Sequence, residues 1–165
     1  MRIGFGYDAH RLKIGRKCIL CGIEIPCEFG PDGHSDADVP VHALMDALLG
    51  ALALGDIGKH FPASDEKWHM ADSIELLKLV YNMVCRHGYF LENADITIVL
   101  ESPKLSSYID KMRTRIAGAL GVDRERISVK ATTEEGMGFT GNGTGISATA
   151  AVLMNSEFEI RNSEL

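Results

Sequence analysis

The first residues of the chain, MRIGFGYD, carry glycine at every second position of an apolar run, and this spacing restricts the fold more than any other feature of the sequence. Residues 2–8 have the composition of a β-strand. Glycine inside a strand marks a place where another part of the backbone approaches closely, because no side chain stands between the two. Gly4 and Gly6 therefore predict that another element packs directly on this first strand.

Hydrophobic periodicity and capping residues predict the remaining elements. Helices are expected over 39–54, from an Asp72 cap to about Gly88, and from Ser106 or Ser107 to Gly121. Strands are expected over 17–27, 95–100, 127–132 and 146–154, and loops over 29–38, 56–70 and 134–145. This order predicts an α+β fold (α/β layers), in which helices pack on one face of a single mixed β-sheet of ferredoxin-like type. Residues 1–165 are expected to form a single domain, because no repeat or linker interrupts them.

The composition limits the possible partners. The 165 residues carry a formal net charge of −6, which argues against a nucleic-acid-binding protein, whose surface would be basic. The longest apolar run, residues 47–55, is too short to cross a bilayer, and the N-terminus has no secretion or transit pattern. We therefore expect a cytoplasmic protein with no nucleic-acid or membrane partner.

The cysteines do not form a recognisable zinc motif. Cys18-x-x-Cys21 resembles half of a zinc ribbon, but the sequence has no second C-x-x-C. In a strand over 17–27, their odd separation would place the two thiols on opposite faces. We expect these residues, with Cys27 and Cys85, to be small buried or half-buried hydrophobic residues of a reducing compartment.

Three side chains form a candidate metal site. Asp8 and His10 lie on one face of an extended segment, because side chains alternate along a strand. His42, in the first turn of the helix over 39–54, would add a third ligand from a different element. An Asp/His/His set suits Zn²⁺ and leaves one tetrahedral position open, as in catalytic sites. The spacing also permits a structural interpretation, in which Asp8 caps a turn and both histidines are ordinary polar residues.

Two more carboxylates share a helical stripe with His42. Asp38 and Asp46 stand four residues before and after it, so all three lie on one face of the helix. Asp46 could orient the ring of His42. A solvated helix face, with Asp38 capping the N-terminus, explains both carboxylates without a chemical role, and we favour that interpretation.

Several segments have the composition of anion or polyol sites. His34 and Ser35 precede a helix, whose N-terminus attracts anions through unpaired N–H groups. Asp56, at the expected C-terminus of that helix, opposes the helix dipole and is a natural partner for the hydroxyls of a polyol. Lys104 and Ser106 precede another helix start and form a second anion site.

The segment KATTEE, residues 130–135, combines a cation, two hydroxyls and two carboxylates at the end of a strand. Thr132 and Thr133 can bind phosphate oxygens, and a glutamate beside them can hold Mg²⁺. Lys104 and Lys130 supply local positive charge in a negative chain. The sequence thus predicts a diphosphate substrate bound at a metal site.

Together these motifs resemble one enzyme family. GYDAHRL, GHSDADVPVHALMDALLGALALGDIGKHFP, ADS, SPKL and VKATTEEGMGFTGNGTGI are similar to segments of the 2-C-methyl-D-erythritol 2,4-cyclodiphosphate synthases, from Met1 to about Leu153. The resemblance implies the IspF-type fold of this family, assembled as a homotrimer with active sites at subunit interfaces. It implies conversion of 4-diphosphocytidyl-2-C-methyl-D-erythritol 2-phosphate into the cyclodiphosphate and CMP. It also implies Zn²⁺ or another divalent cation as cofactor, with Mg²⁺ or Mn²⁺ on the substrate diphosphate.

The resemblance also assigns roles to residues. Asp8, His10 and His42 correspond to the zinc ligands, Glu135 to a Mg²⁺ ligand, and His34 and Thr133 to catalytic residues that stabilise the transition state. The residues assigned to substrate binding are Asp8, His10, His34, Ser35, Asp56, Ile57, Gly58, Phe61, Pro62, Ala63, Ser64, Asp65, Leu100, Pro103, Lys104, Leu105, Ser106, Ala131, Thr132, Thr133, Glu134, Glu135, Phe139 and Asn142.

Within that set, residues 56–58 correspond to the erythritol pocket and 61–65 to a mobile substrate loop. Residues 100–106 and 131–133 correspond to the cytidine and phosphate site, which comes from the neighbouring subunit. In the implied reaction the 2-phosphate of the substrate attacks its own β-phosphorus. This agrees with a sequence that offers no Ser/His or Cys/His pattern for a protein nucleophile.

A few positions depart from the family pattern. Many members carry arginine at position 142 and acidic residues at 144 and 149, a cluster linked in the family to isoprenoid diphosphates on the trimer axis. This chain has Asn142, Thr144 and Thr149, so we expect weak or absent binding of such ligands. Ala63 stands where an acidic residue is common, which would remove one contact of the substrate loop.

Two other classes of function fit some of the same residues. A zinc hydrolase could use the Asp/His/His set, but it needs a general base beside the metal-bound water, and no H-E-x-x-H motif or neighbouring glutamate supplies one. A non-enzymatic metal-binding oligomer is the other alternative. It has no need of the anion sites before the helices or of the KATTEE segment.

Overall fold

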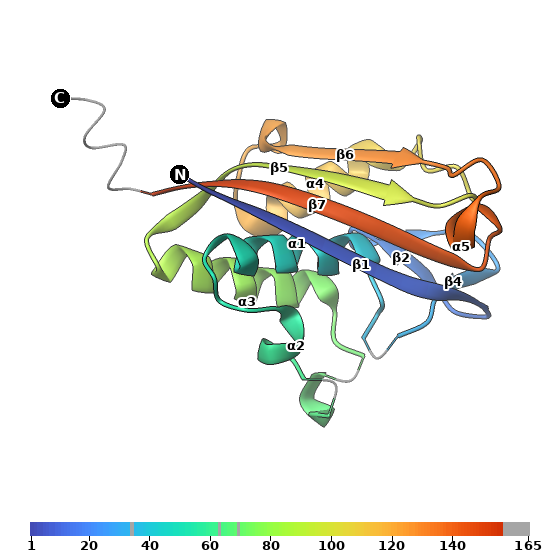
Figure 1. Cartoon of the computed structure of the whole chain (residues 1–165), viewed down its shortest axis with the longest axis horizontal. Helices are drawn as coiled ribbons and strands as arrows, with labels where there is room; N and C mark the ends of the chain where they lie inside the picture. The colour runs from blue at the N-terminus through green and yellow to red at the C-terminus, as the bar shows by residue number, and fades with distance from the viewer. Residues whose placement is uncertain (34, 63, 69, 157–165) are drawn as a thin grey trace.

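The computed structural model describes residues 1–33, 35–62, 64–68 and 70–156. Its five-stranded sheet has the order β4 (Phe29–Pro31), β1 (Arg2–Ile14), β7 (Gly145–Ser156), β5 (Tyr89–Val99) and β6 (Ile127–Thr132) (Figure 1). Neighbouring strands are antiparallel except β5 and β6, which run parallel. The predicted mixed sheet is therefore confirmed. The ferredoxin-like prediction is wrong, because the elements do not follow the βαββαβ order of that motif.

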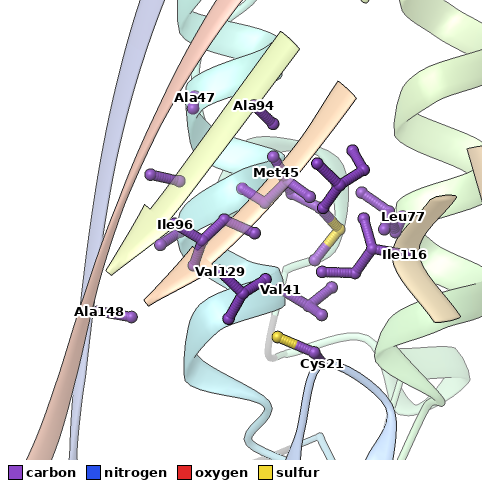
Figure 2. Packing of buried hydrophobic residues seen from close by; sticks show 14 of the residues in the cluster. Cys21, Val41, Met45, Ala47, Leu77, Ala94, Ile96, Ile116, Val129 and Ala148 are labelled. Carbon is purple, nitrogen blue, oxygen red and sulfur yellow. The ribbon is translucent and has the colours of Figure 1, made fainter. Parts of the chain in front are cut away.

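Three long helices cover one face of the sheet (Figure 1). The helix α1 (Val39–Ala51) packs on β1 and β7, α3 (Ser73–Arg86) packs on α1, and α4 (Ile109–Leu120) packs on β6. Apolar side chains of both layers fill the space between them, and Figure 2 shows among these Val41, Met45, Leu77, Ile96, Ile116 and Val129. On the opposite face, β1 exposes Ile3, Phe5 and Tyr7, with exposed fractions of 77, 67 and 52%.

Short elements connect these layers. They are β2 (Cys18–Leu20), β3 (Ile23–Ile25), α2 (Ile57–His60), the 3-10 helices η1 (Glu66–Trp68) and η2 (Arg124–Arg126), and α5 (Gly138–Gly141). Throughout the described ranges, the helices all lack the combination of length and apolar composition that crossing a bilayer requires.

The two glycines of β1 allow α1 to lie directly on the strand. A Cβ atom at Gly4 would collide with the carbonyl oxygen of Ala47, and one at Gly6 with the carbonyl oxygen of Ala43. Both obstacles are backbone atoms of α1, which cannot turn aside as a flexible side chain could. The predicted close approach at Gly4 and Gly6 is confirmed, and it fixes the distance between α1 and the face of β1 that carries Asp8.

The segment 17–27 is a hairpin of β2 and β3 rather than one strand. Cys21 and Gly22, with φ of 53° and 70°, form its two-residue turn. Positive φ at both central residues suits a tight hairpin, but cysteine gives no sequence signal for it. The N–H groups of both residues donate to the carboxylate of Asp38, at 2.8 and 2.6 Å. The predicted opposite faces for Cys18 and Cys21 are therefore wrong.

The cysteines differ in burial. Cys18 and Cys21 are buried, Cys27 is half-buried and Cys85 is exposed, and none of them forms a disulfide. Burial raises the pKa of the Cys21 thiol well above its usual value. The prediction of buried or half-buried hydrophobic residues is confirmed for the first three and wrong for Cys85.

Three other boundaries differ from prediction. Phe29–Pro31 pairs with the end of β1 as strand β4, although its Gly and Pro residues predict a loop. The helix α1 ends at Ala51, since Ala53 already has a positive φ of 56°. The cap of α4 is Tyr108, without a side-chain hydrogen bond, so neither Ser106 nor Ser107 has the predicted capping role.

Candidate active site

Asp8, His10 and His42 converge at one place. Their potential ligand atoms all lie within 4.8 Å of one another. Oδ2 of Asp8 is 3.1 Å from Nδ1 of His42 and 3.4 Å from Nε2 of His10. Two imidazoles and one carboxylate form a donor set that suits Zn²⁺ and related divalent cations. The structure therefore contains a group of three side chains that can bind a divalent metal ion.

The convergence has both local and tertiary causes. Asp8 and His10 share a face of β1 because they are two residues apart. His42 comes from the first turn of α1, which Asp38 caps by accepting a hydrogen bond from the N–H of Val41. The contact of α1 with Gly6 then brings His42 against Asp8. Strand periodicity accounts for two of the three positions, and helix packing accounts for the third.

The remaining nitrogen of each histidine has its own partner in the segment before α1. Nδ1 of His10 donates to the carbonyl oxygen of Asp32 at 2.7 Å, because a carbonyl can only accept. This leaves Nε2 of His10 facing Asp8. Nε2 of His42 lies 3.2 Å from Oγ of Ser35, a hydroxyl that can donate or accept. Both rings are thereby oriented with one nitrogen toward the same point.

The two other carboxylates of the stripe have structural contacts. Asp46 accepts a hydrogen bond from the N–H of Ile57 at 2.8 Å, so it holds the start of α2 and does not orient His42. Asp38 is fully buried, and besides capping α1 it accepts a hydrogen bond from the hydroxyl of Ser73. Burial raises the pKa of Asp38 to about 6. The prediction of a cap at Asp38 is confirmed, whereas the solvated face predicted for both carboxylates is wrong.

Asp8, His10 and His42 form what we call the metal-binding group. The pKa values of Asp8 and His10 are both shifted. Burial works against ionisation of Asp8, but hydrogen bonds from His10 and His42 outweigh it and hold the pKa of this carboxyl well below its usual range. The same hydrogen bond to Asp8 raises the pKa of His10 above 6.5, against the effect of its partial burial. A proton on His10 therefore competes with a metal ion at this site.

Removing the metal is expected to change how stability depends on pH. In the metal-free protein His10 contributes stability that is fully present below pH 6.5 and is lost as the pH rises through its raised pKa. Asp8 contributes stability that is present above pH 3.8 and is lost as the pH falls through its lowered pKa. A metal ion instead binds the neutral imidazole, and its affinity gains about tenfold per pH unit while His10 is protonated.

The difference in melting temperature between metal-loaded and chelator-treated protein should therefore increase from about pH 5.5 to about pH 8. Thermal unfolding at several pH values, with and without chelator, measures this difference. Asp38 titrates in both the metal-loaded and the chelator-treated protein, so its contribution to the pH dependence cancels in the difference. A difference that does not change with pH would show that His10 does not bind the metal.

The predicted erythritol residues lie at the start of α2, which is bonded to α1 at Asp46, one helical turn after His42. Asp56 caps α2 by accepting from the N–H of Lys59 at 2.9 Å, and Asp46 fixes Ile57 to α1. The predicted conflict of Asp56 with the dipole of α1 is wrong, because this carboxylate stands at the favourable N-terminus of the next helix. Asp56, Ile57 and Gly58 thus follow α1 beside the stripe that carries His42.

The predicted substrate loop is partly covered by the structure. The ring of Phe61 packs edge-on against Trp68, with centroids 4.9 Å apart, and Asp65 accepts from the N–H of Lys67. Pro62 and Ser64 lie between them in the chain. His34 and Ala63, also predicted as site residues, lie outside the described residues.

A cavity of about 370 Å³ lies between the ends of β5 and β6 and the start of α4. Within 100–106 and 131–133, every residue that the resemblance assigns to substrate binding lines it, together with Glu101 and Ile109, whereas Ser102 does not. The predicted lining residues are Leu100, Pro103, Lys104, Leu105, Ser106, Ala131, Thr132 and Thr133. Ile109 was not predicted, because only the position of the first turn of α4 brings it there.

The cavity between β5, β6 and α4 is separated from the metal-binding group by three strand spacings of the sheet. Asp8 pairs with Ala148, Ala148 with Ile98, and Ile98 with Ala131. Three strand spacings of about 4.8 Å put roughly 14 Å between the two backbones. Ala148 and Ile98 are buried within this row. In one chain the described parts of the two regions therefore do not form one continuous site.

The KATTEE segment has a mixed arrangement. Thr133 donates its hydroxyl hydrogen to Oε1 of Glu135 at 3.1 Å, which pairs two of the predicted phosphate and Mg²⁺ residues. Glu134 accepts a hydrogen bond from Thr140 of α5. Lys130 forms an ion pair with Asp95 at 2.6 Å, so a carboxylate offsets the local positive charge that the sequence predicts there.

Phe139 and Asn142 belong to the segment around α5. Phe139 and His10 both line a cavity of about 900 Å³. The side-chain oxygen of Asn142 accepts hydrogen bonds from the N–H and hydroxyl of Thr144, at 3.1 and 2.7 Å. Asn142 thus stabilises its own turn and adds no positive charge, and the weak isoprenoid diphosphate binding expected from it stays a prediction.

Comparison with known sequences finds close relatives over nearly the whole chain. The model of the YgbB family matches residues 1–155. The 2-C-methyl-D-erythritol 2,4-cyclodiphosphate synthase of Moorella thermoacetica is 61% identical over 154 residues, covering 93% of this chain and 94% of the relative. The enzyme of the same name from Clostridioides difficile is 54% identical over 154 residues, with coverage of 93% and 96%.

Solved structures have the same fold. The bifunctional IspDF from Campylobacter jejuni superposes with a TM-score of 0.91 at 41% identity, covering 94% of this chain and 42% of that longer chain. A 2C-methyl-D-erythritol-2,4-cyclodiphosphate synthase in its CDP-bound form superposes with a TM-score of 0.86 at 36% identity, covering 93% of this chain and all of the other.

Proposed function

The chain belongs to the YgbB family and has 2-C-methyl-D-erythritol 2,4-cyclodiphosphate synthase activity, and we propose that Asp8, His10 and His42 hold the divalent metal of this reaction. The reaction converts 4-diphosphocytidyl-2-C-methyl-D-erythritol 2-phosphate into the cyclodiphosphate and CMP, a step of non-mevalonate isoprenoid biosynthesis. The observation that carries the proposal is the convergence of one carboxylate and two imidazoles within 4.8 Å.

The donor set fits Zn²⁺. Three protein ligands leave a fourth position for an oxygen of the substrate, and both histidines already have partners on their other nitrogens. When bound, the metal would neutralise phosphate charge and polarise a phosphate oxygen. We assign a second cation, Mg²⁺ or Mn²⁺, to Glu135, a hard oxygen ligand of the kind these ions prefer.

The protein supplies position and charge rather than a nucleophile. The 2-phosphate of the substrate attacks the β-phosphorus and CMP leaves, so the task of the chain is to hold a bent substrate in line. Such orientation can contribute about 7–11 kcal/mol in an intramolecular step. Oδ1 of Asp56 caps α2, and its other oxygen can accept a hydroxyl of the erythritol. Thr133, now bonded to Glu135, can instead donate to a phosphate oxygen, and we assign His34 the same role.

The cytidine end is assigned to the cavity lined by Lys104 and Ala131. Lys104 brings a positive charge, and backbone and hydroxyl groups of Thr132 and Thr133 can donate to phosphate oxygens. The CDP-bound form of the solved relative supports a cytidine-linked substrate.

We further propose a homotrimer in which the metal group of one subunit faces the cytidine cavity of the next. Two observations support it. In one chain the two regions are about 14 Å apart across the sheet. The exposed apolar row of Ile3, Phe5 and Tyr7 on β1 also needs a covering surface. The single domain, the cytoplasmic location and the lack of nucleic-acid or membrane partners stay predictions from the sequence.

An assay with the diphosphocytidyl substrate in the presence of Zn²⁺ and Mg²⁺ tests the function. We expect CMP and the cyclic product in equal amounts. Phosphorus NMR and chromatography measure both products. Release of inorganic phosphate without a cyclic product would instead indicate a metal-dependent hydrolase. A protein that binds metal but turns over no substrate would indicate a metal-binding oligomer.

A further inference from the structure

Arg16, in the turn between β1 and β2, has no contact with the metal-binding group, yet its side chain reaches the segment that orients both histidines. Its Nη2 donates to the carbonyl oxygen of Gly33 at 2.8 Å and its Nε to that of Pro31 at 3.4 Å. Nε also lies 3.7 Å from the carboxylate of Asp32, between these two residues. The side chain is only 29% exposed. One guanidinium thus holds three consecutive residues.

Two of these residues, Asp32 and Gly33, lie against the ring of His10. The carbonyl oxygen of Asp32 accepts the hydrogen of Nδ1 of His10 at 2.7 Å. A Cβ atom at Gly33 would lie only 2.8 Å from Cε1 of that ring, so the imidazole packs on the backbone itself. Two residues further on, Ser35 lies 3.2 Å from Nε2 of His42. The segment from Pro31 to Ser35 therefore carries the partners of both histidine rings.

Contacts with β1 hold the beginning of this segment. The N–H of Asp32 donates to the carbonyl of Arg11 at 2.9 Å, and strand pairing with β1 ends at Pro31. Among the described residues, Arg16 donates to the carbonyl oxygens of the two peptides that flank the Asp32–Gly33 peptide, those of Pro31 and Gly33. Holding both neighbours sets the direction of the Asp32 carbonyl between them. Arginine suits this task, because its planar fork donates along several fixed directions and lysine has no such fork.

We propose that Arg16 is a positioning residue of the metal site: by clamping Pro31 and Gly33 it aims the Asp32 carbonyl at Nδ1 of His10 and so directs Nε2 toward the metal. This proposal rests on the proposed role of Asp8, His10 and His42 as ligands. Partners of metal-ligating histidines typically change metal affinity by about 10- to 100-fold when they are lost. Arg16 would act one step further out, through the backbone that carries the partner.

The test compares Arg16→Gln with Lys13→Gln. Lys13 also lies near the carboxylate of Asp32, at 3.7 Å, but it forms no bond to the carbonyls. Zn²⁺ affinity is measured on the metal-free proteins by competition with a chelator, and the protonated nitrogen of His10 is identified by nitrogen-15 NMR. We expect Arg16→Gln to bind Zn²⁺ about 10-fold or more weakly, with signals of both His10 tautomers, and Lys13→Gln to resemble the parent.

Several outcomes would overturn the proposal. Arg16→Gln with Zn²⁺ affinity within about threefold of the parent, or with hydrogen still only on Nδ1 of His10, would show that the segment keeps its shape without the clamp. Equal losses in both variants would indicate a charge effect rather than positioning. If Arg16→Gln does not fold, Arg16→Lys replaces it, with the same readouts and the same criteria. A parent protein that binds no Zn²⁺ would instead refute the ligand assignment itself.

Discussion

Asp8→Asn is expected to lose the bound divalent metal and to reduce turnover on the order of 1000-fold. The carboxylate of Asp8 lies between the two imidazoles, 3.1 and 3.4 Å from their nearest nitrogens. Its negative charge offsets the metal, and an amide removes that charge at nearly constant size. His42→Ala removes the ligand from α1 and is expected to have the same effect.

Metal content and CMP release, measured on the same samples, check this prediction. Asp110→Asn is the matched control, since it removes an exposed carboxylate on α4 that contacts only arginines, and it should keep full metal and activity. Circular dichroism establishes that each variant is folded. Metal retained by both Asp8→Asn and His42→Ala would refute the ligand assignment.

The same variant tests whether the site is shared between subunits. Ala131→Trp would fill the cytidine cavity from an exposed position on β6, so it should be folded and inactive. When Asp8→Asn and Ala131→Trp chains are unfolded together and reassembled, about a quarter of the interface sites combine two intact halves. Activity should therefore return to roughly that fraction. A mixture that stays inactive would place both halves of the site in one chain.

Gly6→Ala is expected to lower the free energy of unfolding by about 3 kcal/mol or more. The added Cβ would meet the carbonyl oxygen of Ala43 and, at 2.8 Å, the nitrogen of Ala47. Both atoms belong to the backbone of α1, so the helix has to move away from β1. Because His42 precedes Ala43, the movement should also separate His42 from Asp8 and weaken metal binding.

Gly118→Ala is the matched control for this substitution. Gly118 lies within α4, and a Cβ there would have no neighbour within 4 Å. The same change should then stabilise the protein by about 0.5–1 kcal/mol through helix propensity. Urea unfolding of the metal-free proteins separates the two effects. If the free energies of unfolding of Gly6→Ala and Gly118→Ala differ by less than about 1 kcal/mol, the close contact of α1 with β1 does not make the predicted contribution to stability.

The sequence predicted the site best where a short-range rule applies. Asp8 and His10 share a face because strand side chains alternate, and Asp38 caps α1 because its side chain reaches a free N–H three residues on. Residues 100–106 and 131–133 were predicted to belong together on the resemblance, and all of them except Ser102 line one cavity. These inferences depend on residue type and local geometry, both of which are present in the linear chain.

Other features depend on tertiary contacts that no local sequence pattern predicts. The carbonyl of Asp32 orients His10, and every residue has a carbonyl, so no residue type marks this one. The turn at Cys21 forms because the buried carboxylate of Asp38 accepts its N–H. The sequence predicts local positive charge at Lys130, and only the pairing of neighbouring strands shows that Asp95 offsets it.

The sequence by itself thus determined the family, the long helices and most strands of the main sheet, and the kinds of side chain in the site. The tertiary structure alone decided which of them meet. The packing of α1 on the glycines of β1 brings His42 to Asp8. The strand order puts β6 three strands from β1, which separates the cytidine cavity from the metal group. Strand order and helix packing depend on the burial of apolar side chains that are far apart in the sequence. The free energy of this burial is distributed over the whole core, so no single position in the sequence reveals it.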